Sequence, residues 1–131
     1  MKQLIGLVIV LFFCRTGFAQ DKKSIVGTWK VTAMAFDFDG DGQSDRDLWR
    51  PCREGSTFTF QEDGNGNQYK GAKPCGNPAQ NPAPFHWSIA GADMISMQQG
   101  ANSELVQILY VGNGSLKLYW KKSKLLLQLE R

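Results

Sequence analysis

Alternation of apolar and polar residues is the feature that most constrains how this chain can fold. It is clearest in "GTWKVTAMAF", "STFTF" and "FHWSI", where every second residue is aromatic, aliphatic or small, as in strands with one buried face. Five further segments complete a count of eight strands. The eight cover residues 27–36, 56–60, 67–71, 85–89, 94–98, 104–111, 115–122 and 124–131. From residue 20 onward no stretch has helical periodicity longer than a turn or two, so an all-β fold is expected.

The connections between these segments favour a closed barrel. Short Gly, Asn and Asp turns such as "EDGNGN", "AGAD" and "GNGS" join antiparallel neighbours. One connection is long, residues 72–84, and its four Pro residues are expected to exclude both helix and central strand. Eight short strands joined by hairpins form either an up-and-down barrel or a two-sheet sandwich. We expect a single eight-stranded antiparallel up-and-down barrel, because closure removes exposed edges and a sandwich usually needs long crossings.

The first nineteen residues have the layout of a secretory signal peptide. "MKQ" is a short basic start, "LIGLVIVLFF" is an apolar run, and "GFA" offers small residues for cleavage after Ala19. Lipidation of Cys14 is disfavoured because Phe12 and Phe13 precede it. We therefore expect a signal peptide at 1–19, a domain at 20–131, a periplasmic or secreted location and no stable membrane anchor.

Charge and cysteine usage exclude several classes of function. Two of the 15 basic residues lie in the signal segment and 12 residues are acidic, so the rest carries about +1, which gives no reason to expect nucleic-acid binding. Cys52 and Cys75 form an even pair in an oxidising compartment, which predicts a disulfide. His86 is the only histidine, so neither a Cys-His nor a Ser-His-Asp constellation is indicated. The chain is not expected to be an enzyme.

Residues 37–47 contain five Asp and two Gly, and two interpretations of them stay open. Aligned with a twelve-position calcium loop, Asp37, Asp39, Asp41 and Asp45 fall at positions 1, 3, 5 and 9. Gly42 then falls at the sharp turn, and Gln43 offers its carbonyl from position 7. Against this, Leu48 stands where a bidentate Glu belongs. The loop is either a polar turn or a weak structural calcium site, with a Kd on the order of 10⁻⁴ to 10⁻³ M.

The order of these parts resembles the small, secreted lipocalin-like domain proteins of bacteria. "GTW" at Gly27–Trp29 is similar to the G-x-W that opens lipocalin barrels, and an Asp/Gly loop, a first Cys, "TFTF", a second Cys and a Trp-containing strand follow in the same order. The resemblance covers nearly the whole chain after residue 20 and implies a lipocalin-like barrel. The chain is shorter than true lipocalins and lacks their second and third motifs and their flanking helix. The resemblance implies no specific activity, because most members of this family have no known function.

Two functions compete at this point. In the first, the barrel carries a small hydrophobic ligand in a pocket lined by Trp29, Phe58, Phe60, Trp87, Leu118 and Trp120. In the second, the same side chains fill the barrel and the protein acts through its surface on a protein partner. An eight-stranded barrel is barely wide enough to be filled by its own side chains, so large aromatic residues favour a filled core. The resemblance favours the carrier, which is the leading specific hypothesis, and the interaction module with a filled core is an equally serious alternative.

Overall fold

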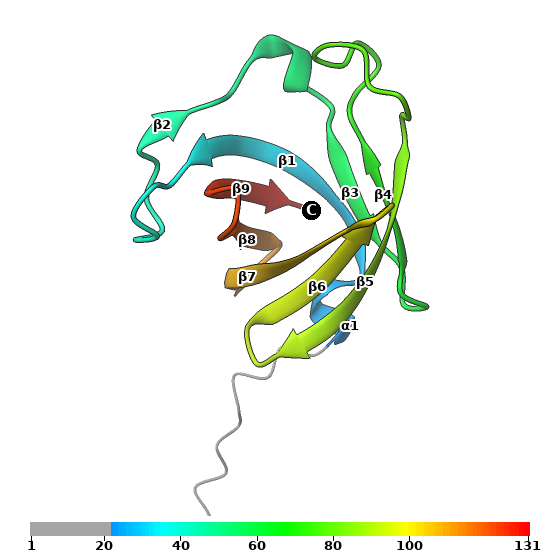
Figure 1. The fold of residues 1–131 in the computed structure, drawn as a ribbon, viewed down its shortest axis with the longest axis vertical. Coiled ribbons are helices and arrows are strands. Elements are labelled where there is room, and N and C mark those ends of the chain that lie inside the picture. The colour runs from blue at the N-terminus through cyan, green and yellow to red at the C-terminus, as the bar shows by residue number, and fades with distance from the viewer. Residues whose placement is uncertain (1–21) are drawn as a thin grey trace, which may run out of the picture.

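Eight strands close into an antiparallel barrel in the computed structural model, which describes residues 22–131 (Figure 1). Each strand pairs with the next, and β1 pairs with β9 to close the barrel. The strands are β1 (Gly27–Phe36), β3 (Thr57–Phe60), β4 (Asn65–Tyr69), β5 (Ala83–Gly91), β6 (Met94–Gln99), β7 (Asn102–Gly112), β8 (Ser115–Trp120) and β9 (Leu125–Glu130). The predicted all-β, up-and-down barrel is confirmed. The predicted signal peptide and its cleavage site lie outside the described residues.

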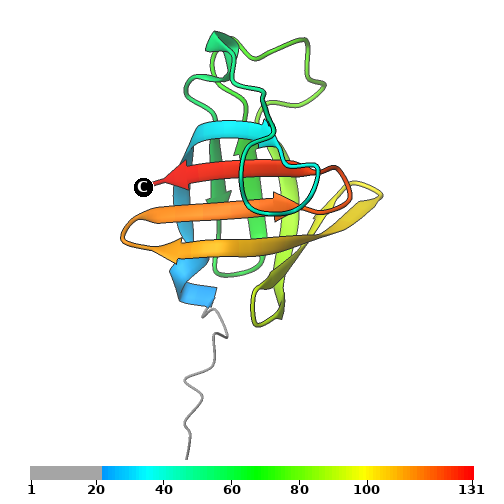
Figure 2. The ribbon, with the colours of Figure 1, turned by 90° about the vertical axis from the view of Figure 1, so that its left-hand side faces the viewer.

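Three short elements lie outside the eight strands of the barrel. Strand β2 (Arg46–Asp47) pairs with the end of β1, α1 (Lys22–Ile25) precedes β1, and the 3₁₀ turn η1 (Pro51–Arg53) precedes β3. Figure 2 shows α1 below one end of the barrel and η1 at the opposite end. Within residues 22–131, no helix is both long enough and apolar enough to cross a membrane.

The bounds of β4, β5, β7 and β8 differ by up to two residues from those predicted. β4 lies two residues earlier than 67–71, because Asn65 and Gly66 pair with His86 and Phe85 across the β4–β5 ladder. β5 begins at Ala83, two residues before the predicted strand, and includes Pro84, which lies in the segment expected to exclude central strand. The reason is local: β6 pairing starts only at His86, so β5 has a single neighbour at Pro84 and behaves as an edge strand there.

Inward-facing side chains fill the end of the barrel nearest α1. Ile25 closes this end, and each of its central side chains is at most 4% exposed. They include Trp29, Phe60, Trp87, Ile95, Leu116 and Leu129. Phe60 packs edge-on against Trp87, with ring centroids 5.2 Å apart, and the Trp29 indole donates a hydrogen bond to the Ile25 carbonyl. The alternating apolar side chains therefore fill this half of the barrel completely, and we call the filled half the floor of the barrel.

Candidate functional site

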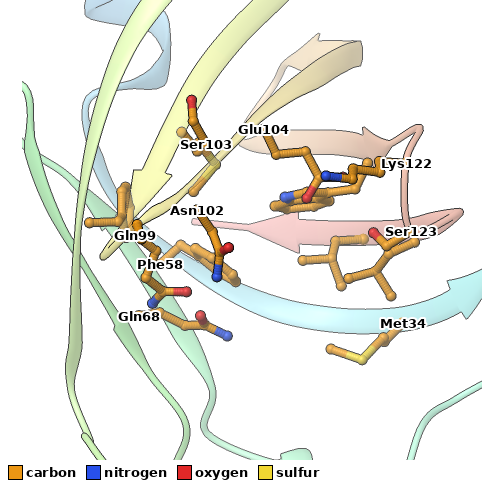
Figure 3. Close-up of a pocket in the computed structure, with 15 residues that line it drawn as sticks. Met34, Phe58, Gln68, Gln99, Asn102, Ser103, Glu104, Lys122 and Ser123 are labelled. Atoms are coloured by element: carbon orange, nitrogen blue, oxygen red, sulfur yellow. The ribbon is translucent and has the colours of Figure 1, made fainter.

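The opposite end of the barrel holds a cavity of about 760 Å³ (Figure 3). It lies where β1 ends and β7 begins, and its apolar wall comes from six strands. That wall includes Met34, Phe58, Phe85, Met97, Trp120 and Leu127. Polar side chains such as Gln68, Asn102 and Glu104 also line the cavity. The arrangement suits a molecule with a large apolar part and a small polar part.

The structure divides the six residues expected to line a pocket into two groups. Phe58 and Trp120 line the cavity, and their rings pack together with centroids 6.2 Å apart. Trp29, Phe60, Trp87 and Leu118 lie in the filled half of the barrel instead. Trp87 donates its indole N–H to two backbone carbonyls, those of Gln61 and Asn65, which are 2.9 and 3.1 Å away.

Several apolar wall residues were not among the predicted pocket residues, including Met34, Phe85 and Met97. Phe85 lies two residues before Trp87 on the same face of β5, and Met97 lies two residues after Ile95 on β6. Alternation could therefore have identified them as inward-facing. Met34 lies after an irregularity in the β1–β9 register between Val31 and Ala33, which a strict period of two does not anticipate.

A second, smaller cavity of about 420 Å³ adjoins the first, since both are lined by Met34, Phe58 and Gln68. The predicted disulfide lies in its wall: Cys52 and Cys75 are bonded, with Cα atoms 5.1 Å apart. The bridge ties η1 to the Pro-rich connection above the open end of the barrel. Arg53 and Lys70 also line this cavity and place two cationic side chains there.

The acidic loop lies outside the barrel, across β8 and β9 (Figure 2). The Tyr119 hydroxyl donates a hydrogen bond to the Asp37 carbonyl at 2.7 Å, and Lys117 Nζ donates to the Gly42 carbonyl at 2.6 Å. Burial raises the pKa of the Tyr119 hydroxyl, and the charge of Asp37 adds to the rise. The loop is thus fastened to β8 at two points and does not border the cavity.

The side chain of Asp37 holds the acidic loop together by hydrogen bonds to its backbone. Its side chain is fully shielded from solvent and accepts hydrogen bonds from the backbone amides of Gly40 and Gly42 at 2.9 and 2.8 Å. Burial raises the pKa of Asp37, but hydrogen bonds from Gly42 and the Asp39 side chain outweigh it, so the pKa lies below its ordinary value. The hydrogen bond to Asp37 raises the pKa of Asp39, which therefore holds a proton more readily.

Four carboxylates of this loop form a cluster that could hold a metal ion. Asp37, Asp39, Asp41 and Asp45 each offer one oxygen, and these four atoms lie within 4.8 Å of one another. The fifth predicted ligand, Gln43, lies in the same loop and donates its backbone N–H to Asp41 Oδ1 at 2.9 Å. Gly42 has φ +82°, the left-handed conformation that the sharp turn requires.

His86 lies on the outer face of β5, where its side chain is exposed, while its neighbours Phe85 and Trp87 point inward. It therefore does not enter the cavity. This placement agrees with its interpretation as an ordinary strand residue.

Comparison with known proteins relates the chain to a protein family. A family model described as a lipocalin-like domain matches residues 25–118, which includes every barrel strand except β9 and the last two residues of β8. No curated protein and no solved structure matches the chain significantly.

Proposed function

The chain belongs to the lipocalin-like domain family, and on that premise we propose that it is a non-enzymatic carrier of a small hydrophobic ligand. Lipocalin-like barrels typically bind small hydrophobic ligands, which supports the carrier function. The ligand would occupy the 760 Å³ cavity, with Phe58 and Trp120 among the residues that contact it.

The cavity is the observation that supports this proposal most directly. Its volume of about 760 Å³ lies inside the range of roughly 300–1,000 Å³ that is typical of small-molecule sites. The filled half of the barrel gives it a floor, so a ligand can enter from one end only. Aromatic residues were expected to leave little room, but Trp29, Phe60 and Trp87 lie together at one end and leave the other end hollow.

Uptake of a neutral hydrophobic probe tests the carrier function. We expect N-phenyl-1-naphthylamine to bind saturably, with a rise in its fluorescence. Ala101→Phe places a bulky side chain at the cavity and should weaken binding, because Ala101 lies in the β6–β7 turn that borders it. Ala92→Phe is the matched control, since Ala92 is an exposed residue of the β5–β6 turn and does not line the cavity. Absence of saturable uptake in the wild-type protein would reject the carrier function.

The alternative function is an interaction module that binds a protein partner through its surface. Its support is two exposed large side chains on β7, Leu105 and Tyr110, which are 54% and 48% exposed. Nothing on this surface specifies the chemistry of a partner, so the cavity makes the carrier the better-supported function.

Two further properties belong to this proposal. The first is export, with residues 1–19 removed and the domain released to a periplasmic or secreted location; the Cys52–Cys75 disulfide supports it, because such bonds persist in oxidising compartments. The second is a structural calcium ion held by Asp37, Asp39, Asp41 and Asp45, with Gln43 offering its carbonyl. The clustering of four carboxylate oxygens supports it, since calcium prefers oxygen ligands.

A further inference from the structure

Among residues 22–131, Glu104 is the only acidic residue that lines the larger cavity. It occupies the position on β7 that precedes Val106 and Ile108 on the same face, and those two side chains are 0% and 5% exposed. Its partner across the β6–β7 ladder is Met97, another wall residue. The alternation of β7 would place an apolar side chain at this position, and the chain has a carboxylate there instead.

One oxygen of this carboxylate, Oε1, is buried and has no hydrogen-bond partner within residues 22–131. Leaving a buried acceptor without a hydrogen bond destabilises the protein, and the cost is larger when the acceptor is charged. Buried polar atoms in native proteins are nearly always satisfied by protein, ligand or water. A ligand that carries a hydrogen-bond donor could therefore bind to Glu104 Oε1 at the cavity wall.

Lys122 does not satisfy this oxygen. It lines the same cavity and is drawn on the same side as Glu104 in Figure 3, but it is exposed, and no ion pair within 4.0 Å joins the two in the described part of the chain. An exposed ammonium group is well hydrated and gains little from a surface ion pair. Glu104 Oε1 therefore still lacks a hydrogen-bond donor.

We propose that the ligand is an amphiphile whose polar end is a hydrogen-bond donor, of which a protonated amine fits best, bound by Glu104. This inference rests on the proposed carrier function. The apolar part of such a molecule would lie against Phe58, Phe85 and Trp120 while its donor reaches the carboxylate at the end of the wall. A charge-assisted hydrogen bond between an ammonium group and a carboxylate is stronger than a neutral one, so the amine gains more than an alcohol does.

An anionic amphiphile is the main competitor. It would be repelled by Glu104, but Arg53 and Lys70 in the adjoining cavity would attract it. Both cations are only half-buried, and Arg53 already donates its Nε–H to the Leu48 carbonyl at 2.8 Å. Neither Arg53 nor Lys70 leaves a buried polar atom without a hydrogen-bond partner, whereas Glu104 does. We therefore expect Glu104 to determine which headgroup binds.

Three amphiphiles with the same dodecyl tail test the proposal: dodecylamine, dodecanol and dodecanoate, each displacing N-phenyl-1-naphthylamine below its micelle concentration. We expect the amine to bind at least about tenfold more tightly than the alcohol, as a hydrogen bond to a charged group implies. In Glu104→Gln this preference for the amine over the alcohol should fall to about threefold or less. Glu62→Gln is the matched control and should keep the preference, because Glu62 is exposed and does not line either cavity.

The outcomes separate this inference from the proposed function. If neither the probe nor any amphiphile binds, the carrier function itself fails. If the tails bind but the amine is no tighter than the alcohol, water satisfies Glu104 and the inference fails while the carrier function stands. Tightest binding of dodecanoate would also overturn it and would point to Arg53 and Lys70. The comparison of headgroups uses the wild-type protein, so it holds even if Glu104→Gln does not fold.

Discussion

The guanidinium carbon of Arg131 lies 4.2 Å from the ring centroid of Trp29, which places a cation over the aromatic face that closes the floor of the barrel. Arg131 also donates a hydrogen bond to the Val26 carbonyl at 2.8 Å, and the Trp29 indole N–H donates one to the Ile25 carbonyl. The last residue of the chain is thereby joined to the segment that leads into β1. This contact reinforces the β1–β9 pairing on which closure of the barrel depends.

Loss of this contact should destabilise the barrel without affecting the cavity. We expect Arg131→Ala to lower the free energy of unfolding by about 1–2 kcal/mol, the sum of a cation–π contact and one hydrogen bond. Arg131→Lys should recover part of the loss, because it keeps the charge but not the planar group. Urea denaturation measures the effect. Arg50→Ala, at an exposed position, should be neutral, and an equal loss in both Ala variants would contradict the role of Trp29.

Gly66 on β4 is the position where an added methyl group should be least tolerated. A Cβ atom there would collide with the Phe85 ring and lie 2.7 Å from the Thr59 carbonyl oxygen. Overpacking of this kind costs about 1–3 kcal/mol, so Gly66→Ala should lower the melting temperature by several degrees. Gly91→Ala is the matched control, because its Cβ would have ordinary contacts at 3.8 Å and its φ is not positive. Equal melting temperatures for the two variants would contradict this packing.

The sequence predicted the architecture because period-two alternation and Gly-rich turns are local signals. β1, β3 and β6 lie within about a residue of their expected bounds. β4 was misplaced because "NGNQY" has little apolar alternation, and its position depends on pairing with β5, which is not visible locally. The strand character of Pro84 was missed for the same reason, since only the pairing shows that β5 is an edge there.

The cavity was harder to predict than the barrel. Alternation identifies which side chains point inward but not their height along the barrel axis, which the register between strands sets. Trp29 and Trp120 have the same signal in the sequence, yet one lies in the floor and the other lines the cavity. Glu104 begins the alternation of β7 and was included in a predicted strand, but only the structure shows that its Oε1 is buried without a partner.

The Cys52–Cys75 disulfide should contribute to stability and hold the segments above the cavity. Its two residues are separated by 23 positions, for which the chain-entropy model gives about 3 kcal/mol. We expect Cys52→Ser with Cys75→Ser to lose an amount of this order in urea denaturation. On the chain without residues 1–19, thiol labelling under denaturing conditions should find two thiols after reduction and none before it. Two reactive thiols in the unreduced protein would contradict the bond.

Asp37 should make the stability sensitive to acid. Since its pKa in the folded state is lowered, its carboxylate stabilises the fold above the ordinary pKa of 3.8, and this contribution disappears as the pH falls through the lowered value. We expect Asp37→Asn to be clearly less stable than wild type near about pH 6 and to approach it near about pH 2. Asp47→Asn, at an exposed position outside the cluster, should show no such convergence. A difference between Asp37→Asn and wild type that does not change with pH would contradict the assignment.

Calcium binding by the acidic loop makes the last prediction. The four carboxylate oxygens lie within 4.8 Å of one another, so their negative charges repel and a divalent cation should relieve that repulsion. With a Kd on the order of 10⁻⁴ to 10⁻³ M, about 10 mM calcium should stabilise the fold by about 1.4–2.7 kcal/mol and raise the melting temperature by several degrees. Asp41→Ala should abolish the increase, because Asp41 is exposed and contributes to the cluster without supporting the barrel. Asp47→Ala, outside the cluster, should keep it. A melting temperature indifferent to calcium and to chelator would show that the loop is a polar turn whose carboxylates serve the backbone alone.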